Sequence, residues 1–181
     1  PIAHGKIGAD LLGESAQLPG QIALRDALER LKPLLNDPFT LKIGHDLKFD
    51  ALVMAQHGIT IAPFDDTMLM SYALDAGRGG HGLSELAERH LGHLCLSMDD
   101  VLAHSAGAKK SAKTFAGVPI DKATEYAAEG ADVTLRLWSL LKPRLAAERV
   151  ATVYETLERP LIPVIAAMER DGIKVDREIL S

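Results

Sequence analysis

The stretch from residue 40 to residue 64 restricts the possible fold more than any other part, because two strand-like segments enclose a helix there. Residues 40–44 read TLKIG, a short strand of mixed apolar and polar residues, and residues 59–64 have the pattern of a second strand. The helix predicted between them runs from about Asp46 to His57. The next residue, Gly58, suits the left-handed position that follows a helix. This order indicates an α/β layer.

Helical spacing of apolar residues dominates the rest of the chain. It predicts helices over residues 22–35, 67–74, 84–91, 121–141 and 146–171, the last one bent by Pro160 and Pro163. Residues 103–119 are rich in Ala, Gly, Ser and Lys and are predicted to form a loop. Two strands are too few for a stable sheet. We therefore expect a helix-rich α/β fold that lacks its N-terminal strands.

Charge and cysteine content exclude several classes of protein. The net charge of −5 argues against a protein that coats nucleic acid by bulk charge, but not against a metal-dependent nuclease, whose ions reverse the local field. The single cysteine, Cys95, excludes an internal disulfide and a zinc site built from cysteines, and suits a reducing compartment. No apolar run reaches the ~18 residues of a membrane span. We expect a cytoplasmic protein without membrane contact.

Two carboxylates in the segment GHDLKFD, residues 44–50, are candidates for a metal site. Asp46 and Asp50 are four residues apart on the predicted helix, so they should share one face near its N-terminus. Such a pair of carboxylates can hold a divalent cation. The alternative is that Asp46 caps the helix and Asp50 is solvated.

The segment YAAEGADVT, residues 126–134, places a glycine inside a predicted helix. Gly130 there costs roughly 1 kcal/mol relative to alanine, so its presence needs a reason. Upstream, Lys109, Lys110 and Lys113 form a local basic cluster in a chain of net negative charge. They are either part of a solvated loop or contacts to nucleic-acid phosphates, and we name them as candidate nucleic-acid contacts.

Histidines suggest two further metal patterns, neither of which the sequence favours. The pair His45-Asp46 resembles the HD phosphohydrolases, which need further ligands on separate helices. His90, His93 and Cys95 have a loosely metal-like spacing, but Gly92 ends the helix there. The favoured interpretation is that these histidines lie at a helix end.

Together, several segments resemble the 3′-5′ exonuclease region of bacterial family A DNA polymerases, the DNA polymerase I family. GHDLKFD is similar to the second exonuclease motif of that family and YAAEGADVT to the third. The other matching segments are FDDTML at 64–69, LSELAERHL at 83–91, and 158–176, which is similar to the junction into the polymerase domain. The order and spacing of these pieces carry the resemblance from about residue 22 to the end.

The resemblance implies a ribonuclease H-like 3′-5′ exonuclease fold within a DNA-directed DNA polymerase that acts in replication and repair. It implies a partial exonuclease-like domain over 1–145 and the start of the polymerase thumb over 146–181. The implied partners are a single-stranded 3′ end of DNA and, for the parent protein, a primer-template. The parent is expected to be a monomer at the nucleoid.

The resemblance also implies a site with two Mg²⁺ or Mn²⁺ ions. Asp50 matches the metal-binding Asp of the second motif, with Asp46 as a further possible ligand. Tyr126 matches the tyrosine that orients the attacking water.

Three departures from the family pattern predict that this site is degenerate. The first motif, an Asp-x-Glu on the opening strand, does not appear, the third-motif Asp falls at Gly130, and the second-motif Asn is Asp46. Asp132 cannot replace a side chain at position 130, because two residues turn a helix by about 200°. We expect no bound metal and no exonuclease activity from this chain. An active exonuclease in the intact parent stays open, as does an RNase D-like RNA exonuclease, against which 158–176 argues.

Overall fold

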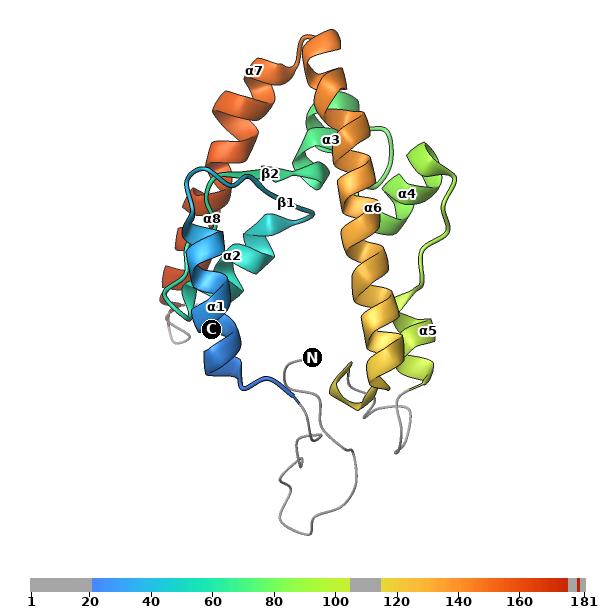
Figure 1. The fold of residues 1–181 in the computed structure, drawn as a ribbon. Helices are drawn as coiled ribbons and strands as arrows, with labels where there is room; N and C mark the ends of the chain where they lie inside the picture. Colours follow the sequence, from blue (N-terminus) through green and yellow to red (C-terminus); the bar gives the residue numbers. More distant parts are fainter. Residues whose placement is uncertain (1–20, 105–114, 176–178, 180–181) are drawn as a thin grey trace.

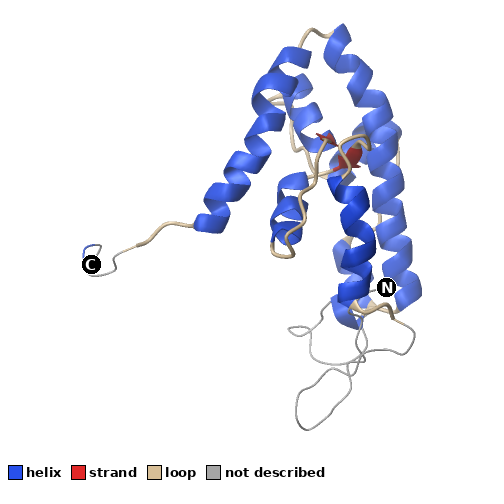
Figure 2. Ribbon diagram, turned by 60° about the vertical axis from the view of Figure 1, so that its left-hand side comes forward, coloured by secondary structure: helices blue, strands red, loops and turns tan. Residues whose placement is uncertain are grey.

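A computed structural model describes residues 21–104, 115–175 and 179, and helices dominate it (Figure 2). The elements in chain order are α1 (Leu24–Asn36), β1 (Lys42–Gly44), α2 (Leu47–Ala55), β2 (Phe64–Asp66), α3 (Thr67–Asp75), α4 (Leu83–Leu91), α5 (Met98–Ala103), the 3-10 turn η1 (Phe115–Gly117), α6 (Ile120–Ala147), α7 (Ala151–Val153), the π-helical turn η2 (Tyr154–Glu158) and α8 (Arg159–Asp171). The predicted helix-rich α/β class is confirmed.

The described residues form one parallel two-stranded sheet. Lys42 pairs with Phe64 and Gly44 with Asp66, and α2 makes the crossover between the strands. The second strand was predicted over 59–64, but it begins only at Phe64. Pro63 has no N–H to donate to a ladder, so regular pairing starts after it.

The core forms around α6, the longest helix, which lies between the small sheet and helices α4 and α5 (Figure 1). Its buried residues Val133, Leu137, Leu141 and Leu145 recur every four positions, as one side of a helix requires. This row packs against buried residues of α3, α4 and η2, which are Met70, Leu86, Ala87 and Tyr154. Another side of α6 contacts strand β1 of the sheet.

The C-terminal helix α8 packs against α2, on the far side of the sheet from α6 (Figure 1). Pro160 lies in its first turn, where a missing N–H costs no hydrogen bond, and Pro163 lies inside it. The irregularity expected near these prolines takes the form of the π-helical turn directly before α8. None of the described helices is both long and apolar enough to cross a lipid bilayer.

Candidate functional site

A cavity of about 670 Å³ lies where the end of β1, the first turns of α2, the start of α4 and the middle of α6 meet. Asp50, Tyr126 and Gly130 all line it, although Asp50 is far from the other two in the sequence. The complete lining is Ile43, Gly44, His45, Phe49, Asp50, Leu83, Tyr126, Gly130, Ala131, Thr134 and Leu135. The structure therefore brings the two predicted catalytic residues to one hollow, together with the position of the missing carboxylate.

Helix α6 supplies its share of the cavity from a single row of residues. Tyr126, Gly130 and Thr134 follow one another at intervals of four and so project from neighbouring turns. The Tyr126 ring packs against the ring of Phe115, with 6.1 Å between the ring centroids. This contact holds the tyrosine at the cavity wall.

Asp50 carries a carboxylate that stands apart from the other side chains of the described residues. No hydrogen bond or ion pair joins its side chain to any other residue that the structure describes. Burial raises the pKa of the Asp50 carboxyl, and the nearby charges of Asp46 and Asp66 raise it further. Asp50 is an exposed residue, as the solvated alternative predicts, so water reaches its carboxylate and no neighbour competes with a cation for it.

Packing around Gly130 does not require a glycine. A Cβ atom placed there would lie 3.8 Å from Leu83 Cδ2, an ordinary van der Waals contact. The residue sits inside a continuous helix, where glycine is unfavourable. The cavity therefore has room for a side chain at position 130, and glycine leaves that room unfilled.

Asp46 does not share the helical face of Asp50, and that prediction is wrong. Its φ of 58° is left-handed, so it stands just outside the helix that begins at Leu47. Aspartate tolerates this conformation better than most residues. Asp46 lines a separate hollow with Lys48 and Asp66. Its role as a metal ligand remains a prediction.

His45 lines the cavity beside Asp50, and the sequence did not single it out for this place. Its Nδ1 lies 2.9 Å from Thr67 Oγ1, while its Nε2 is buried without a hydrogen-bond partner among the described residues. Burial lowers the pKa of the His45 imidazole. The only signal in the sequence was its position next to Asp46.

A second acidic centre at the end of β2 was also missed. Asp66 caps α3 by accepting hydrogen bonds from the backbone N–H groups of Met68 at 2.8 Å and Leu69 at 3.3 Å. It also accepts from Leu47 N at 2.8 Å, which joins the starts of α2 and α3. Burial raises the pKa of the Asp66 carboxyl. Asp66 thus fixes the backbone at the start of α2, the helix that carries Asp50.

Asp65 joins strand β2 to α6, to η2 and to the start of α8. Its fully buried carboxylate accepts hydrogen bonds from Trp138 Nε1 at 2.8 Å, Tyr154 Oη at 3.0 Å, Lys142 Nζ at 3.2 Å and an Arg159 guanidinium nitrogen at 3.0 Å. Burial alone would raise the pKa of Asp65, but the hydrogen bonds and the Lys142 charge lower it overall. We call these five residues the Asp65 hub.

The cavity lining does not fit a pair of divalent ions. Mg²⁺ requires near-octahedral oxygen ligands, and among the described lining residues Asp50 is the one carboxylate. The remaining oxygens of the lining side chains are the hydroxyls of Tyr126 and Thr134. Lys109, Lys110 and Lys113, the predicted nucleic-acid contacts, lie outside the described residues.

Comparisons with known proteins identify the family of this chain. A family model described as 3′-5′ exonuclease matches residues 7–146. The chain is 54% identical to DNA polymerase I of Rhizobium leguminosarum over 181 residues, which is 100% of this chain and 17% of that protein. It is 39% identical to DNA polymerase I of Pseudomonas aeruginosa, over 99% of this chain and 19% of that protein.

Solved structures show the fold. NrnC of Brucella melitensis has a TM-score of 0.62 at 21% identity, covering 87% of this chain and 69% of that one. NrnC bound to pGG has a TM-score of 0.63 at 22% identity, with 90% and 72% covered. NrnC has also been solved with bound Mg²⁺, with a TM-score of 0.56 at 20% identity over 90% and 72% of the two chains.

Proposed function

The chain belongs to the 3′-5′ exonuclease family, and from that premise we propose that it is the exonuclease-type domain of a DNA polymerase I that acts in replication and repair. The support is the identity to bacterial DNA polymerases I along the whole chain. The chain spans less than a fifth of the length of those two relatives. Polymerisation and primer-template binding would thus be carried out by the longer protein, in the cytoplasm at the nucleoid.

We propose that a single-stranded 3′ end of DNA enters the cavity between β1, α2 and α6. The cavity volume falls in the range of about 300–1,000 Å³ that is usual for ligand sites. Tyr126 offers a hydroxyl at the wall, and the Phe49 and Tyr126 side chains offer apolar surface for a base. The net charge of −5 makes this binding weak, and phosphate contacts of Lys109, Lys110 and Lys113 would make it salt-sensitive.

The nuclease chemistry of this site is degenerate in our proposal, and the observation that carries it is Gly130 in the cavity wall. A pair of divalent ions would supply a hydroxide nucleophile and stabilise the leaving 3′ oxygen. The described residues provide Asp50 for that purpose, and position 130, beside it in the cavity, provides nothing. Each lost electrostatic contribution of this kind is commonly worth about 10²- to 10³-fold in rate.

A degradation assay tests this proposal. A labelled single strand of DNA is incubated with Mg²⁺ or Mn²⁺ and with the chain, its Asp50→Ala variant or its Gly130→Asp variant. Asp132→Ala is the matched control, because Asp132 is an exposed carboxylate two residues from Gly130. We expect no metal-dependent digestion from any of them. Gly130→Asp alone should not restore digestion, because two carboxylates remain too few for two ions.

Metal-dependent digestion that Asp50→Ala abolishes and Asp132→Ala leaves intact would show instead that the site is a working 3′-5′ exonuclease. A labelled RNA strand run in parallel separates the remaining alternative. Digestion of RNA in preference to DNA would support an RNase D-like enzyme.

A further inference from the structure

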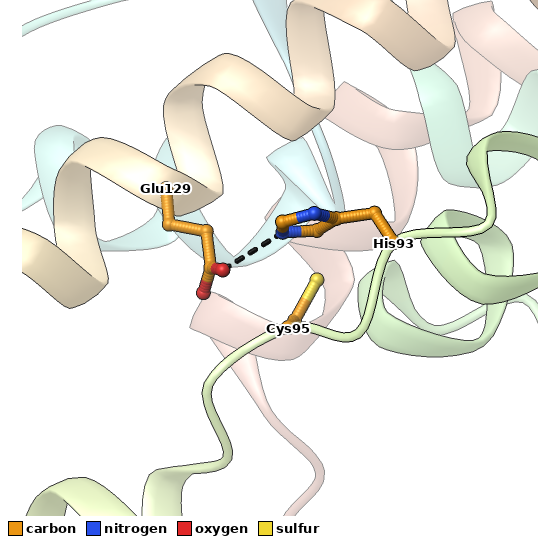
Figure 3. Close-up of side chains that lie close together, drawn as sticks. All are labelled: His93, Cys95 and Glu129. Carbon is orange, nitrogen blue, oxygen red and sulfur yellow. Dashed lines mark hydrogen bonds and ion pairs between the residues drawn. The ribbon is translucent and has the colours of Figure 1, made fainter.

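Three side chains of metal-binding type converge away from the cavity, on the side of α6 that faces the connection between α4 and α5. His93, Cys95 and Glu129 each place a ligand atom within 4.8 Å of the others (Figure 3). They offer a ring nitrogen, a sulfur and a carboxylate oxygen, and all three side chains are half-buried. We call this group the His-Cys-Glu cluster.

The fold holds each member of the cluster in place. Gly92 takes a left-handed φ of 62° at the end of α4, and the His93 N–H donates to Ala87 O at 3.2 Å, so the chain turns back sharply before His93. Glu129 projects from the interior of α6. The Leu96 N–H donates to one oxygen of Glu129 at 2.8 Å, which fixes the carboxylate in orientation.

The second oxygen of Glu129 and the thiol of Cys95 face the remaining space. His93 Nε2 lies 2.8 Å from Glu129 Oε1 (Figure 3). The backbone donor behind the carboxylate is the kind of outer contact that orients a metal ligand.

We propose that His93, Cys95 and Glu129 bind one Zn²⁺ ion. Zinc takes nitrogen, sulfur and oxygen ligands in a tetrahedron, and three protein ligands leave its fourth position to water. Bonds of about 2.0–2.3 Å set neighbouring ligand atoms about 3.3–3.6 Å apart. The His93–Glu129 contact therefore opens by roughly half an ångström, and the sulfur closes in by up to about 1 Å. The thiol proton leaves to solvent as the Zn–S bond forms.

The ion would join the connection between α4 and α5 to α6 at the residue before Gly130. Glu129 and Gly130 are neighbours on the helix, but they point to different surroundings: one to the cluster, the other to the cavity. The zinc ion would thus also fix the position of the cavity wall. It is independent of any ion held by Asp50, and its presence does not depend on nuclease activity.

Cobalt titration of the metal-free chain tests the proposal directly. Co²⁺ occupies tetrahedral zinc sites and shows a sulfur-to-cobalt absorption band when a thiolate is a ligand. Since Cys95 is the one cysteine of the sequence, that band can come from no other residue. We expect it to saturate at one ion per chain and to be displaced by Zn²⁺.

Variants assign the ligands. Cys95→Ser should remove the band, and Cys95→Ser and His93→Gln should each weaken Zn²⁺ binding at least about 100-fold in competition with a chromophoric chelator, since even outer contacts are worth 10- to 100-fold. His57→Gln, at an exposed histidine near the end of α2, and Asp50→Ala should both leave the affinity unchanged. Circular dichroism spectra of all four variants check that the fold is retained.

The proposal also predicts a gain in thermal stability for the original chain on adding Zn²⁺, absent in Cys95→Ser. It is overturned if Co²⁺ binds without the sulfur band, if Zn²⁺ binds the Cys95→Ser variant as tightly as the original chain, or if Asp50→Ala removes the zinc.

Discussion

The Asp65 hub and the cavity around Asp50 show two opposite uses of a carboxylate within one small protein. Asp65 is fully buried and receives hydrogen bonds from four side chains, whereas Asp50 has no partner among the described residues and faces a hollow. The pKa of Asp65 is lowered and that of Asp50 is raised. The carboxylate that stabilises the fold receives hydrogen bonds from its neighbours, whereas Asp50 is exposed and receives none from the described residues. Substitutions in the hub should therefore lower the free energy of unfolding, and substitutions at the cavity should raise it.

The largest effect is expected from Asp65→Ala. It leaves the buried Tyr154 hydroxyl without its acceptor and removes the buried partner of Lys142 and Arg159, which both keep an ion pair with Glu155. Breaking a buried pair costs about 3–5 kcal/mol. Since the Lys142 and Arg159 side chains are 33% and 30% exposed, we expect a loss of about 3 kcal/mol in the free energy of unfolding, measured by urea titration. Asp132→Ala, which breaks an exposed ion pair to Arg136, is the control and should change it by less than about 1 kcal/mol. Equal effects of the two variants would refute the distinction.

Tyr154→Phe sharpens the comparison within the hub. The Tyr154 hydroxyl accepts from the Asp66 N–H at 2.9 Å and donates to Asp65 at 3.0 Å, so its removal leaves a buried N–H unpaired. We expect a loss of about 1–3 kcal/mol in the free energy of unfolding. Tyr72→Phe, at a tyrosine 46% exposed, is a matched control. A neutral outcome for Tyr154→Phe would mean that the hub is packed rather than hydrogen-bonded.

Gly130→Ala should change stability in the opposite direction. The added methyl group meets Leu83 at ordinary contact distance and lies in a helix interior. The variant should unfold at higher urea, with a gain of about 0.5–1 kcal/mol. A loss of stability would show that Gly130 is required by the fold, and the degeneracy argument would lose its basis.

Asp50→Asn should give the smallest effect, and its pH dependence is the informative part. The folded-state pKa of Asp50 is raised. Its contribution to stability is therefore fully present below its ordinary pKa and is lost as pH rises through the folded-state value. At neutral pH the asparagine variant should melt on the order of 1 °C higher, and this gain should fade under acid conditions. A gain independent of pH would contradict the assigned cause.

Local patterns sufficed to predict most of the fold. The order of strand, helix and strand and the long helix α6 follow from apolar spacing, which is a property of neighbouring residues. The start of β2 was misplaced because regular pairing begins only with Phe64 opposite Lys42, after Pro63, which has no N–H to donate. The helix α5 was not predicted, since its six residues are too few to show a period.

The sites depended on contacts that no local pattern encodes. The resemblance to known motifs named Asp50 and Tyr126, and the structure adds that both line one cavity. The Asp65 hub could not be foreseen, because Asp65 and Arg159 are 94 positions apart. Glu129 likewise meets His93 across 36 positions. From the sequence, His93 and Cys95 were interpreted as residues at a helix end. Their third partner, Glu129, lies on another element, α6.

Helix α6 carries residues of both regions on one row at intervals of four: Tyr126, Gly130 and Thr134 at the cavity, then Trp138 and Lys142 at the hub. The helix therefore fixes the distance and the rotation between the two regions. One residue inserted between Thr134 and Trp138 would rotate one set by about 100° relative to the other. The α6 side chains of either the hub or the cavity would then point away from their present neighbours. This segment can exchange residue types, as Gly130 illustrates, but its length cannot vary without loss of one of the two regions.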